Sequence, residues 1–183
     1  MYIEVETVIP AELSDPTWRL YTEAFDELRT TAVQRHVMHR DEFDEVLRDQ
    51  RVLKYLGHDP ERAHQLAALA TFTNELDTMP LISPDYFAHR WPQLYAEKRI
   101  WYIGFFAIHP DCRGSGIFEL VIADMWQRVQ ASDGIAALDI CRRNDRIGLA
   151  RAIHQTLTSL TEGASASRMD EQTYWLYELP ARP

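Results

Sequence analysis

The feature that most constrains this chain is an apolar stretch that runs into a glycine-bearing turn and then into a periodic helix. Residues 101–108 predict a buried strand, and the turn that follows holds Gly114 and Gly116. Apolar residues then recur at helical spacing, at Ile117, Leu120, Val121, Met125 and Val129. The first N–H groups of a helix have no intrahelical acceptor and lie at the positive end of its dipole. The pattern therefore favours an anion, such as a phosphate, bound at the turn.

The residues of the turn agree with this interpretation. Glycine has no Cβ, so the backbone at Gly114 and Gly116 can approach an anion closely. Pro110 ends the hydrogen-bond ladder of the strand, and Arg113 adds a fixed positive charge. The candidate binding residues are Arg113, Gly114, Ser115, Gly116 and Ile117.

Two common nucleotide-binding patterns do not fit. The P-loop needs a glycine, four residues and then Gly-Lys-Ser/Thr, and the sequence holds no such run. The dinucleotide fingerprint G-x-G-x-x-G fails because Gly116 is followed by Ile117, Phe118 and Glu119 without the third glycine.

The segment resembles motif A of the GCN5-related N-acetyltransferase (GNAT) superfamily. There a strand that ends in V-x-P leads to R/Q-x-x-G-x-G/A and a helix. Here Ile108-His109-Pro110 stands at V-x-P, and residues 113–118 stand at the turn. Phe118 departs from the pattern, because the family has a small residue at its position.

A second motif of the same superfamily follows. Residues 135–141 predict a short buried strand, in which Leu138-Asp139-Ile140 stands at the family's L-E-V. Asn144 follows Ile140 at the family's spacing. The helix expected over residues 147–160 begins about three residues later than usual, so that Ala150 takes the alanine position and His154, one helical turn on, takes the tyrosine position.

The resemblance covers residues 100–160 and implies a fold, a co-substrate and residue roles. It implies one GNAT-like acyltransferase domain over residues 1–183, of the α/β (α+β) class, with a central mixed, mostly antiparallel sheet flanked by helices. It also implies an N-acyltransferase that uses acetyl-coenzyme A or another acyl-coenzyme A as co-substrate, without a metal, and a primary amine of a small molecule or peptide as acceptor.

The roles follow from the family's chemistry. The backbone N–H of Ile108 would lie near the thioester carbonyl, and Asn144 would contribute to the cofactor site. Ile103 stands where many members carry a glutamate, so Asp139 is the candidate base. His154 is the candidate acid, since histidine can donate a proton near neutral pH.

Other interpretations of these residues stay open. Asp139 would otherwise be a structural carboxylate near Arg142 or Arg143, and these two arginines are either close to the phosphates or solvated. His154 would otherwise lie on the helix surface. A non-catalytic module that binds an acyl-coenzyme A or acyl-carrier thioester is the alternative function, and an acyl-homoserine-lactone-like synthase is a weaker one.

The amino-acid composition limits which partners the chain can bind. The formal net charge of −9 and the pI near 5.2 argue against nucleic acid and suit a cationic acceptor. No signal peptide and no membrane-spanning run is visible, and two cysteines indicate no disulfide framework, so a cytoplasmic location is expected. No histidine pair has zinc-type spacing. A homodimer is left open.

The rest of the chain predicts further elements. We expect a strand in residues 1–12, a helix from Ser14, a second helix over residues 41–49, strands over residues 52–56 and 65–72, and a turn at residues 57–60. A helical insert begins at Ser83-Pro84, before the cofactor-binding strand. Its aromatic residues either roof an acceptor pocket or pack the insert onto the core. Residues 172–179 predict a strand that closes the sheet.

Overall fold

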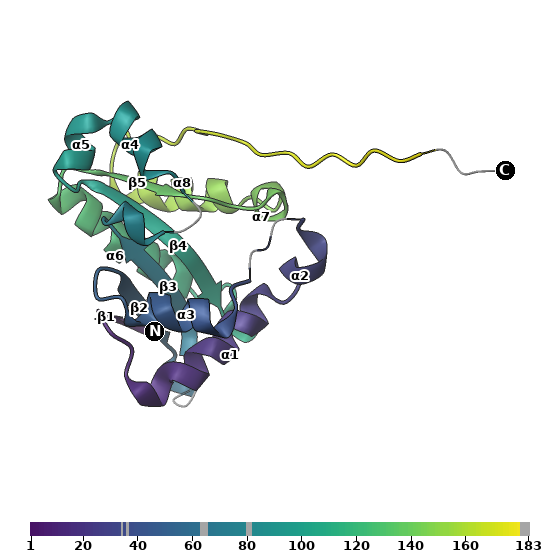
Figure 1. The fold of residues 1–183 in the computed structure, drawn as a ribbon. Helices are drawn as coiled ribbons and strands as arrows, with labels where there is room; N and C mark the ends of the chain where they lie inside the picture. The colour runs from purple at the N-terminus through teal and green to yellow at the C-terminus, as the bar shows by residue number, and fades with distance from the viewer. Residues whose placement is uncertain (34, 36, 63–65, 80–81, 180–183) are drawn as a thin grey trace.

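The structure is a computed structural model that describes residues 1–33, 35, 37–62, 66–79 and 82–179. Its described strands form one five-stranded sheet in the order β1-β2-β3-β4-β5 (Figure 1). Their bounds are Tyr2–Glu6, Leu53–His58, Leu66–Thr73, Ile100–Ile108 and Ile135–Leu138. The pairs from β1 to β4 are antiparallel and β5 runs parallel to β4. This confirms the expected mixed, mostly antiparallel sheet.

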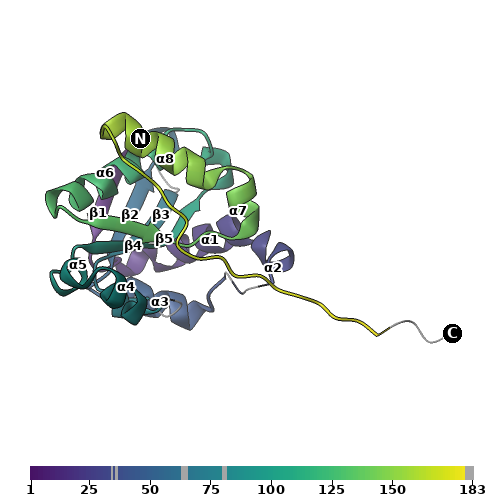
Figure 2. The same cartoon turned by 90° about the horizontal axis from the view of Figure 1, so that it is seen from above.

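Helices cover both faces of the sheet (Figure 2). Their bounds are Ser14–Phe25 for α1, Leu28–Thr31 for α2, Arg40–Arg48 for α3, Pro84–Arg90 for α4, Pro92–Ala96 for α5, Ile117–Ala131 for α6, Arg142–Arg146 for α7 and Leu149–Leu160 for α8. Helices α1 and α3 bury apolar residues such as Tyr21 and Phe43 against one face. Helix α6 buries Val121 and Met125 against the other, where Leu157 of α8 also packs.

The expected helical insert is present as α4 and α5. Ser83 caps α4 by accepting a hydrogen bond from the backbone N–H of Tyr86, and Pro92 separates the two helices. The side chain of Phe87 is buried against Ile100 and Tyr102 of β4. Of the two interpretations of the aromatic insert, packing onto the core is the one that the structure supports.

Several element boundaries differ from those expected. Gly57 and His58 belong to β2 rather than to a turn, and β5 ends at Leu138 rather than at Cys141. The helix expected over residues 147–160 is present as α8 but begins two residues later, at Leu149, because Gly148 before it has a φ of 92° that a helix cannot contain. Residue Gln65, where the second early strand was expected to begin, lies outside the described residues.

The expected C-terminal strand is wrong. Residues 172–179 form no strand, and the chain leaves the body of the molecule as an extended segment (Figure 1). Two contacts hold the residues before this segment against the later helices. Nε2 of His154 lies 3.1 Å from the carbonyl oxygen of Ala164, and Arg168 donates a hydrogen bond to Asp145 at 2.6 Å. These contacts lead the chain back along α8 to α7, so that residues 172–179 lie beyond the sheet.

Candidate functional site

The parting of β4 and β5 defines the centre of the candidate site. Strand β5 pairs with β4 only from Ile100 to Ile103, whereas β4 continues along β3 as far as Ile108. The N–H of His109 donates to the carbonyl oxygen of Ala67 on the β3 side at 2.9 Å. Because successive backbone groups alternate in direction along a strand, the N–H of Ile108 points away from β3, toward the side where β5 has diverged.

A bulge in β4 contributes to this geometry. The β3–β4 register shifts between Thr71 and Phe72, opposite Gly104. A Cβ at Gly104 would lie 2.7 Å from Oγ1 of Thr71 and 2.9 Å from the sulfur of Met79. A larger residue here would therefore displace one of these side chains, and Oγ1 of Thr71 accepts a hydrogen bond from the N–H of Phe105 at 3.2 Å.

Asp139 lies where the two strands separate, directly after Leu138, the partner of Ile103. The hydroxyl of Tyr102 donates a hydrogen bond to Oδ1 of Asp139 at 2.7 Å. Asp139 is exposed, whereas Tyr102 is buried. Burial, followed by the charge of Asp139, raises the pKa of Tyr102 well above its ordinary value, so the phenol stays protonated as a donor.

Tyr102 is a site residue that the sequence did not reveal. In the parallel register it stands beside Ala137, and Asp139 follows two residues later, just past the end of β5. The ring of Phe87 from the insert packs against Tyr102 edge-on, with the ring centroids 6.4 Å apart. The signal that would have found the pair is the β4–β5 register, which the sequence alone does not define.

The glycine turn has the predicted backbone. Gly114 and Gly116 have φ values of 76° and 88°, in the left-handed region that favours glycine. A Cβ at either position would meet no atom within 4 Å, so the space above the turn is open. Arg113 and Ser115 are exposed beside it.

Helix α6 begins directly after this turn. Ile117, its first residue, is buried and packs so close to β2 that a Cβ on Gly57 would lie 2.8 Å from Cγ1 of Ile117. The N–H of Leu120 donates to the carbonyl oxygen of Gly116, so the helical hydrogen bonds start there. The preceding N–H groups of the helix lie at its positive end, next to the open space.

His109 and Cys112 are packed inside the protein next to the glycine turn. Both are buried, and Nδ1 of His109 accepts a hydrogen bond from the N–H of Asp111 at 3.2 Å. Nε2 of His109 lies 3.6 Å from a carboxylate oxygen of Glu23 in α1. A hollow of 430 Å³ lies between α1 and this turn, and its lining includes the carboxylates of Glu23, Asp26 and Asp111.

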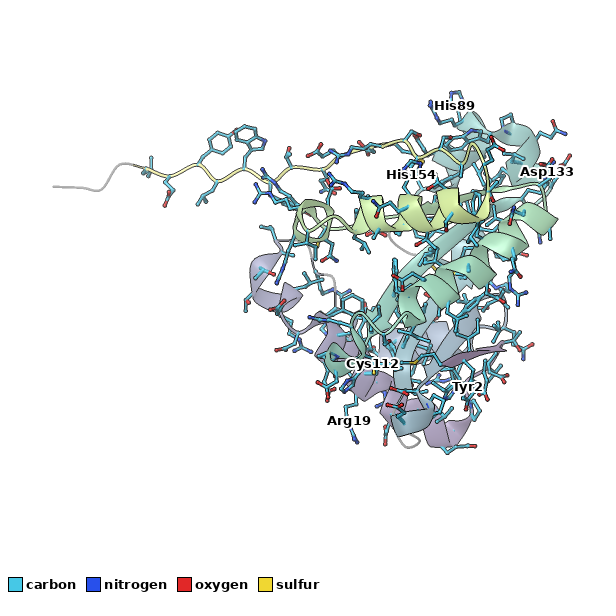
Figure 3. All side chains as sticks on the ribbon, turned by 180° about the vertical axis from the view of Figure 1, so that it is seen from behind. Tyr2, Arg19, His89, Cys112, Asp133 and His154 are labelled. Carbon is cyan, nitrogen blue, oxygen red and sulfur yellow. The ribbon has the colours of Figure 1, made fainter. Side chains whose placement is uncertain are left out.

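The remaining predicted residues lie on the later helices. Asn144 is in α7, and Arg143 beside it forms an ion pair with Glu27 at 2.6 Å. His154 lies on α8 with its ring against the segment that contains Ala164, whereas Cys112 marks the distant glycine turn (Figure 3). The structure brings Asp139 and Tyr102 together but gives no contact between Asp139 and His154.

Phe118 occupies the position that is small in the superfamily. Its ring packs against Phe106 of β4, with the centroids 5.1 Å apart. The side chain therefore fills the space between α6 and the sheet.

The described residues lack two kinds of feature. They contain no group of three His, Cys, Asp or Glu side chains placed to hold a metal ion. None of the helices in the described ranges is long and apolar enough to cross a membrane.

Comparison with known proteins gives a clear result only for the fold. No protein-family model matches the sequence, and no curated protein matches it. Among solved structures, a probable acetyltransferase is similar over 100% of this chain and 99% of its own, with a TM-score of 0.55 and 12% identity.

Two aminoglycoside acetyltransferases are also similar. One, from an uncultured soil metagenomic sample and in complex with sisomicin, has a TM-score of 0.52 and 12% identity over 97% of this chain and 96% of its own. The other, AAC(6')-Iy in complex with the bisubstrate analogue CoA-S-monomethyl-acetylneamine, has a TM-score of 0.52 and 12% identity over 94% of this chain and 100% of its own. The chain therefore shares the fold of these acetyltransferases.

Proposed function

We propose that this chain is an acyl-coenzyme A-dependent N-acyltransferase that transfers an acetyl group from acetyl-coenzyme A to a primary amine of a small molecule or peptide. The observation that carries the proposal is the hydrogen-bonded pair of Tyr102 and Asp139, at the point where β4 and β5 part. The glycine turn, at the far end of the same strand β4, supplies the second half of the site. The fold shared with acetyltransferases supports this combination.

The co-substrate would bind along the opening between β4 and β5. Its pyrophosphate would rest on Arg113, Gly114, Ser115, Gly116 and Ile117, where backbone donors and an exposed guanidinium favour negative charge. The space above the two glycines is open for it. Asn144 remains a proposed contact from α7. The bisubstrate complex of AAC(6')-Iy supports a coenzyme A site in this fold.

The reaction needs a neutral amine. Asp139 would accept the proton that the ammonium group of the acceptor loses, while Tyr102 holds the carboxylate in place. The amine nitrogen then attacks the thioester carbonyl carbon, and a C–N bond forms. The N–H of Ile108, which points into the opening, would stabilise the negative charge that develops on the carbonyl oxygen.

The step is complete when the C–S bond breaks. The electron pair leaves with sulfur, and the coenzyme A thiolate takes a proton, which we assign to His154 as the acid. The products are an amide and the free thiol of coenzyme A. The contact between the His154 ring and the Ala164 carbonyl means that the ring would turn toward the thiolate during this step.

The acceptor is proposed to be cationic. The hollow beside α1 has three carboxylates in its lining, from Glu23, Asp26 and Asp111, and such a surface attracts an ammonium group. The complex of a neighbouring structure with the aminoglycoside sisomicin supports the same class of acceptor.

A thiol-release assay tests the function. Purified protein is incubated with acetyl-coenzyme A and a panel of amines, including aminoglycosides, polyamines and peptides with free N-termini. We expect release of the thiol that depends on one class of amine. If acetyl-coenzyme A binds but no amine in the panel causes release of the thiol, the non-catalytic thioester-binding alternative is favoured instead.

A matched pair of variants then tests the base. Asp139→Asn keeps the size and an acceptor for Tyr102 but removes the charge, so we expect the rate to fall by about 100-fold or more. Asp85→Asn makes the same change at an exposed position in α4 and serves as the control. An Asp139→Asn enzyme with the wild-type rate would remove Asp139 from the mechanism.

A further inference from the structure

Different helices lie on the two sides of the opening between β4 and β5. The last β4–β5 pair is Ile103 with Leu138, and β4 continues alone to Ile108. Just past this pair, the ring of Phe105 packs against Phe25 at the end of α1, with the ring centroids 6.4 Å apart. The end of α1 therefore lies on the β4 side of the opening, whereas α7 follows the carboxyl end of β5.

An ion pair joins these two sides. Glu27, which follows α1 and stands at the start of α2, has a carboxylate oxygen 2.6 Å from Nη2 of Arg143 in α7. Helices α2 and α7 accordingly lie side by side at this end of the molecule (Figures 1 and 2). The pair of Glu27 and Arg143, called the latch below, therefore crosses the opening from the β4 side to the β5 side.

Helix α7 is attached to the rest of the protein mainly by polar contacts. The structure describes all five of its residues, 142–146, and none of them is buried. Besides the latch, the described residues give α7 an ion pair from Asp145 to Arg168, which belongs to the C-terminal segment and not to the core. An element without buried apolar contacts has low local stability, so the ion pairs set the position of α7.

The chain on either side of α7 is suited to act as a joint. Residues 139–141, which connect α7 to β5, form neither helix nor strand. Gly148, which connects α7 to α8, has a φ of 92°, and a Cβ there would meet no atom within 4 Å. Hinges are a few residues at the ends of elements that absorb backbone rotation. Helix α8 itself is held by Leu157, which packs on the core beneath α6, so α7 can move while α8 stays in place.

We propose that α7 is a gate over the opening between β4 and β5, hinged at Gly148 and held closed by the latch of Glu27 and Arg143. Its action on acyl-coenzyme A rests on the function proposed above. Asn144, the proposed co-substrate contact, is the neighbour of Arg143 in α7, so closing the gate brings Asn144 to the bound molecule. The latch side chains are 67% and 40% exposed, and an exposed ion pair is weak enough to open in every catalytic cycle.

Hydrogen exchange tests the latch without any ligand. The backbone N–H groups of Ile147 and Gly148 donate to carbonyl oxygens within α7, so their exchange reports its opening. Glu27→Gln keeps the size of the side chain and removes its charge, and the Glu27 side chain makes no capping bond to α2 that would be lost. We expect both N–H groups to exchange about two- to fivefold faster in this variant than in the wild type.

Glu97→Gln is the matched control. It breaks an exposed ion pair with Arg99 at 2.7 Å, which lies before β4, at the end of that strand opposite the opening. Exchange at Ile147 and Gly148 should stay at the wild-type rate in this control. Equal exchange rates in the wild type and in Glu27→Gln would overturn the latch.

A charge exchange makes the test specific for the pair. Glu27→Arg and Arg143→Glu, each alone, place like charges opposite one another, so both should open α7 at least as much as Glu27→Gln does. The double variant that carries both substitutions restores an opposite-charge pair with reversed polarity. We expect its exchange rates to return to within about twofold of the wild type. A double variant that exchanges as fast as the single variants would contradict a direct interaction.

Stopped-flow release of acetyl-coenzyme A tests the gate. We expect release to be about two- to fivefold faster from Glu27→Gln than from the wild type, and unchanged in Glu97→Gln. Bound acetyl-coenzyme A that leaves the wild type and Glu27→Gln at the same rate would overturn the gate. A wild type that does not bind acetyl-coenzyme A would instead refute the proposed function, and the exchange rates would still decide whether Glu27 and Arg143 hold α7.

Discussion

The hydroxyl of Tyr102 in β4 donates to Oδ1 of Asp139 at 2.7 Å, at the point where β5 leaves β4. The pair joins a buried phenol to an exposed carboxylate, so the carboxylate is fixed in direction while it remains accessible. Phe87 of the helical insert packs on the same phenol. The insert therefore positions the candidate base indirectly, through Tyr102.

Replacing the phenol tests this positioning role. Tyr102→Phe keeps the packing against Phe87 but removes the hydrogen bond to Asp139, so we expect kcat to fall by about tenfold while the KM for acetyl-coenzyme A stays unchanged. The free energy of unfolding should fall by about 1 kcal/mol. Steady-state kinetics and urea unfolding measure the two effects. Tyr86→Phe in α4 of the insert is the control, and equal losses of kcat in both variants would contradict the role.

The proposed phosphate site at the glycine turn can be tested with a negatively charged substitution. Gly116→Glu places bulk and a negative charge where we propose the pyrophosphate, so the affinity for acetyl-coenzyme A should fall by about 100-fold or more. Gly163→Glu is matched in backbone strain, because Gly163 has a φ of 77° and no atom within 4 Å of its Cβ position. Calorimetry on both variants measures the affinities. Unchanged binding by Gly116→Glu would show that the phosphate site lies elsewhere.

The role of His154 as acid predicts a particular kinetic pattern. Because the acid acts on the leaving thiolate and not on bound co-substrate, His154→Ala should lower kcat by about tenfold or more and leave the affinity for acetyl-coenzyme A nearly constant. Single-turnover kinetics measure the chemical step, and calorimetry measures the affinity. A variant with the wild-type rate would remove His154 from the mechanism.

Lys54 predicts a dependence of stability on pH. Its buried Nζ donates to the carbonyl oxygens of Thr7 and Asp49 at 2.8 and 2.5 Å, and burial lowers the pKa of Lys54 from 10.5 to about 8. Between these values the unfolded chain binds a proton that the folded chain has lost. The free energy of unfolding should therefore rise with pH across this window, by at most about 1.4 kcal/mol per pH unit.

Two buried tyrosines, Tyr55 and Tyr102, lower the free energy of unfolding at the upper end of this pH range. Burial raises the pKa of Tyr55 and Tyr102 above the ordinary value of 10.0, so their contribution to stability is present below pH 10 and decreases above it. Urea unfolding of the wild type and Lys54→Met between about pH 8 and 10 isolates the lysine. The variant should show the flatter curve, and parallel curves would contradict the assignment.

The local parts of the fold could be predicted from the sequence. The strand before Pro110, the turn with Gly114 and Gly116 and the helix from Ile117 each depend on neighbouring residues, and all three are present. Ser83 and Pro84 likewise predict the start of α4. The helix expected over residues 147–160 is present as α8, and only its start differs, because Gly148 has a left-handed backbone and the helix begins at Leu149.

Pairing between residues that are far apart in the chain was harder to predict from the sequence. Strand propensity predicted a strand at residues 172–179, but no strand forms there, because propensity alone does not supply a neighbouring strand to pair with. The bond from Tyr102 to Asp139 depends on the parallel register, which no local pattern defines. Asp139 became a candidate only because it stands at a motif position. Its partner, Tyr102, stands at no position of either motif.

We propose that the opening between β4 and β5, with its glycine turn, binds an acyl-coenzyme A. Isothermal titration of the purified wild-type protein with acetyl-coenzyme A measures this binding. We expect saturable binding with one co-substrate per chain and a dissociation constant on the order of micromolar. Folded protein that binds neither acetyl-coenzyme A nor longer acyl-coenzyme A derivatives would show that this opening is not a co-substrate site.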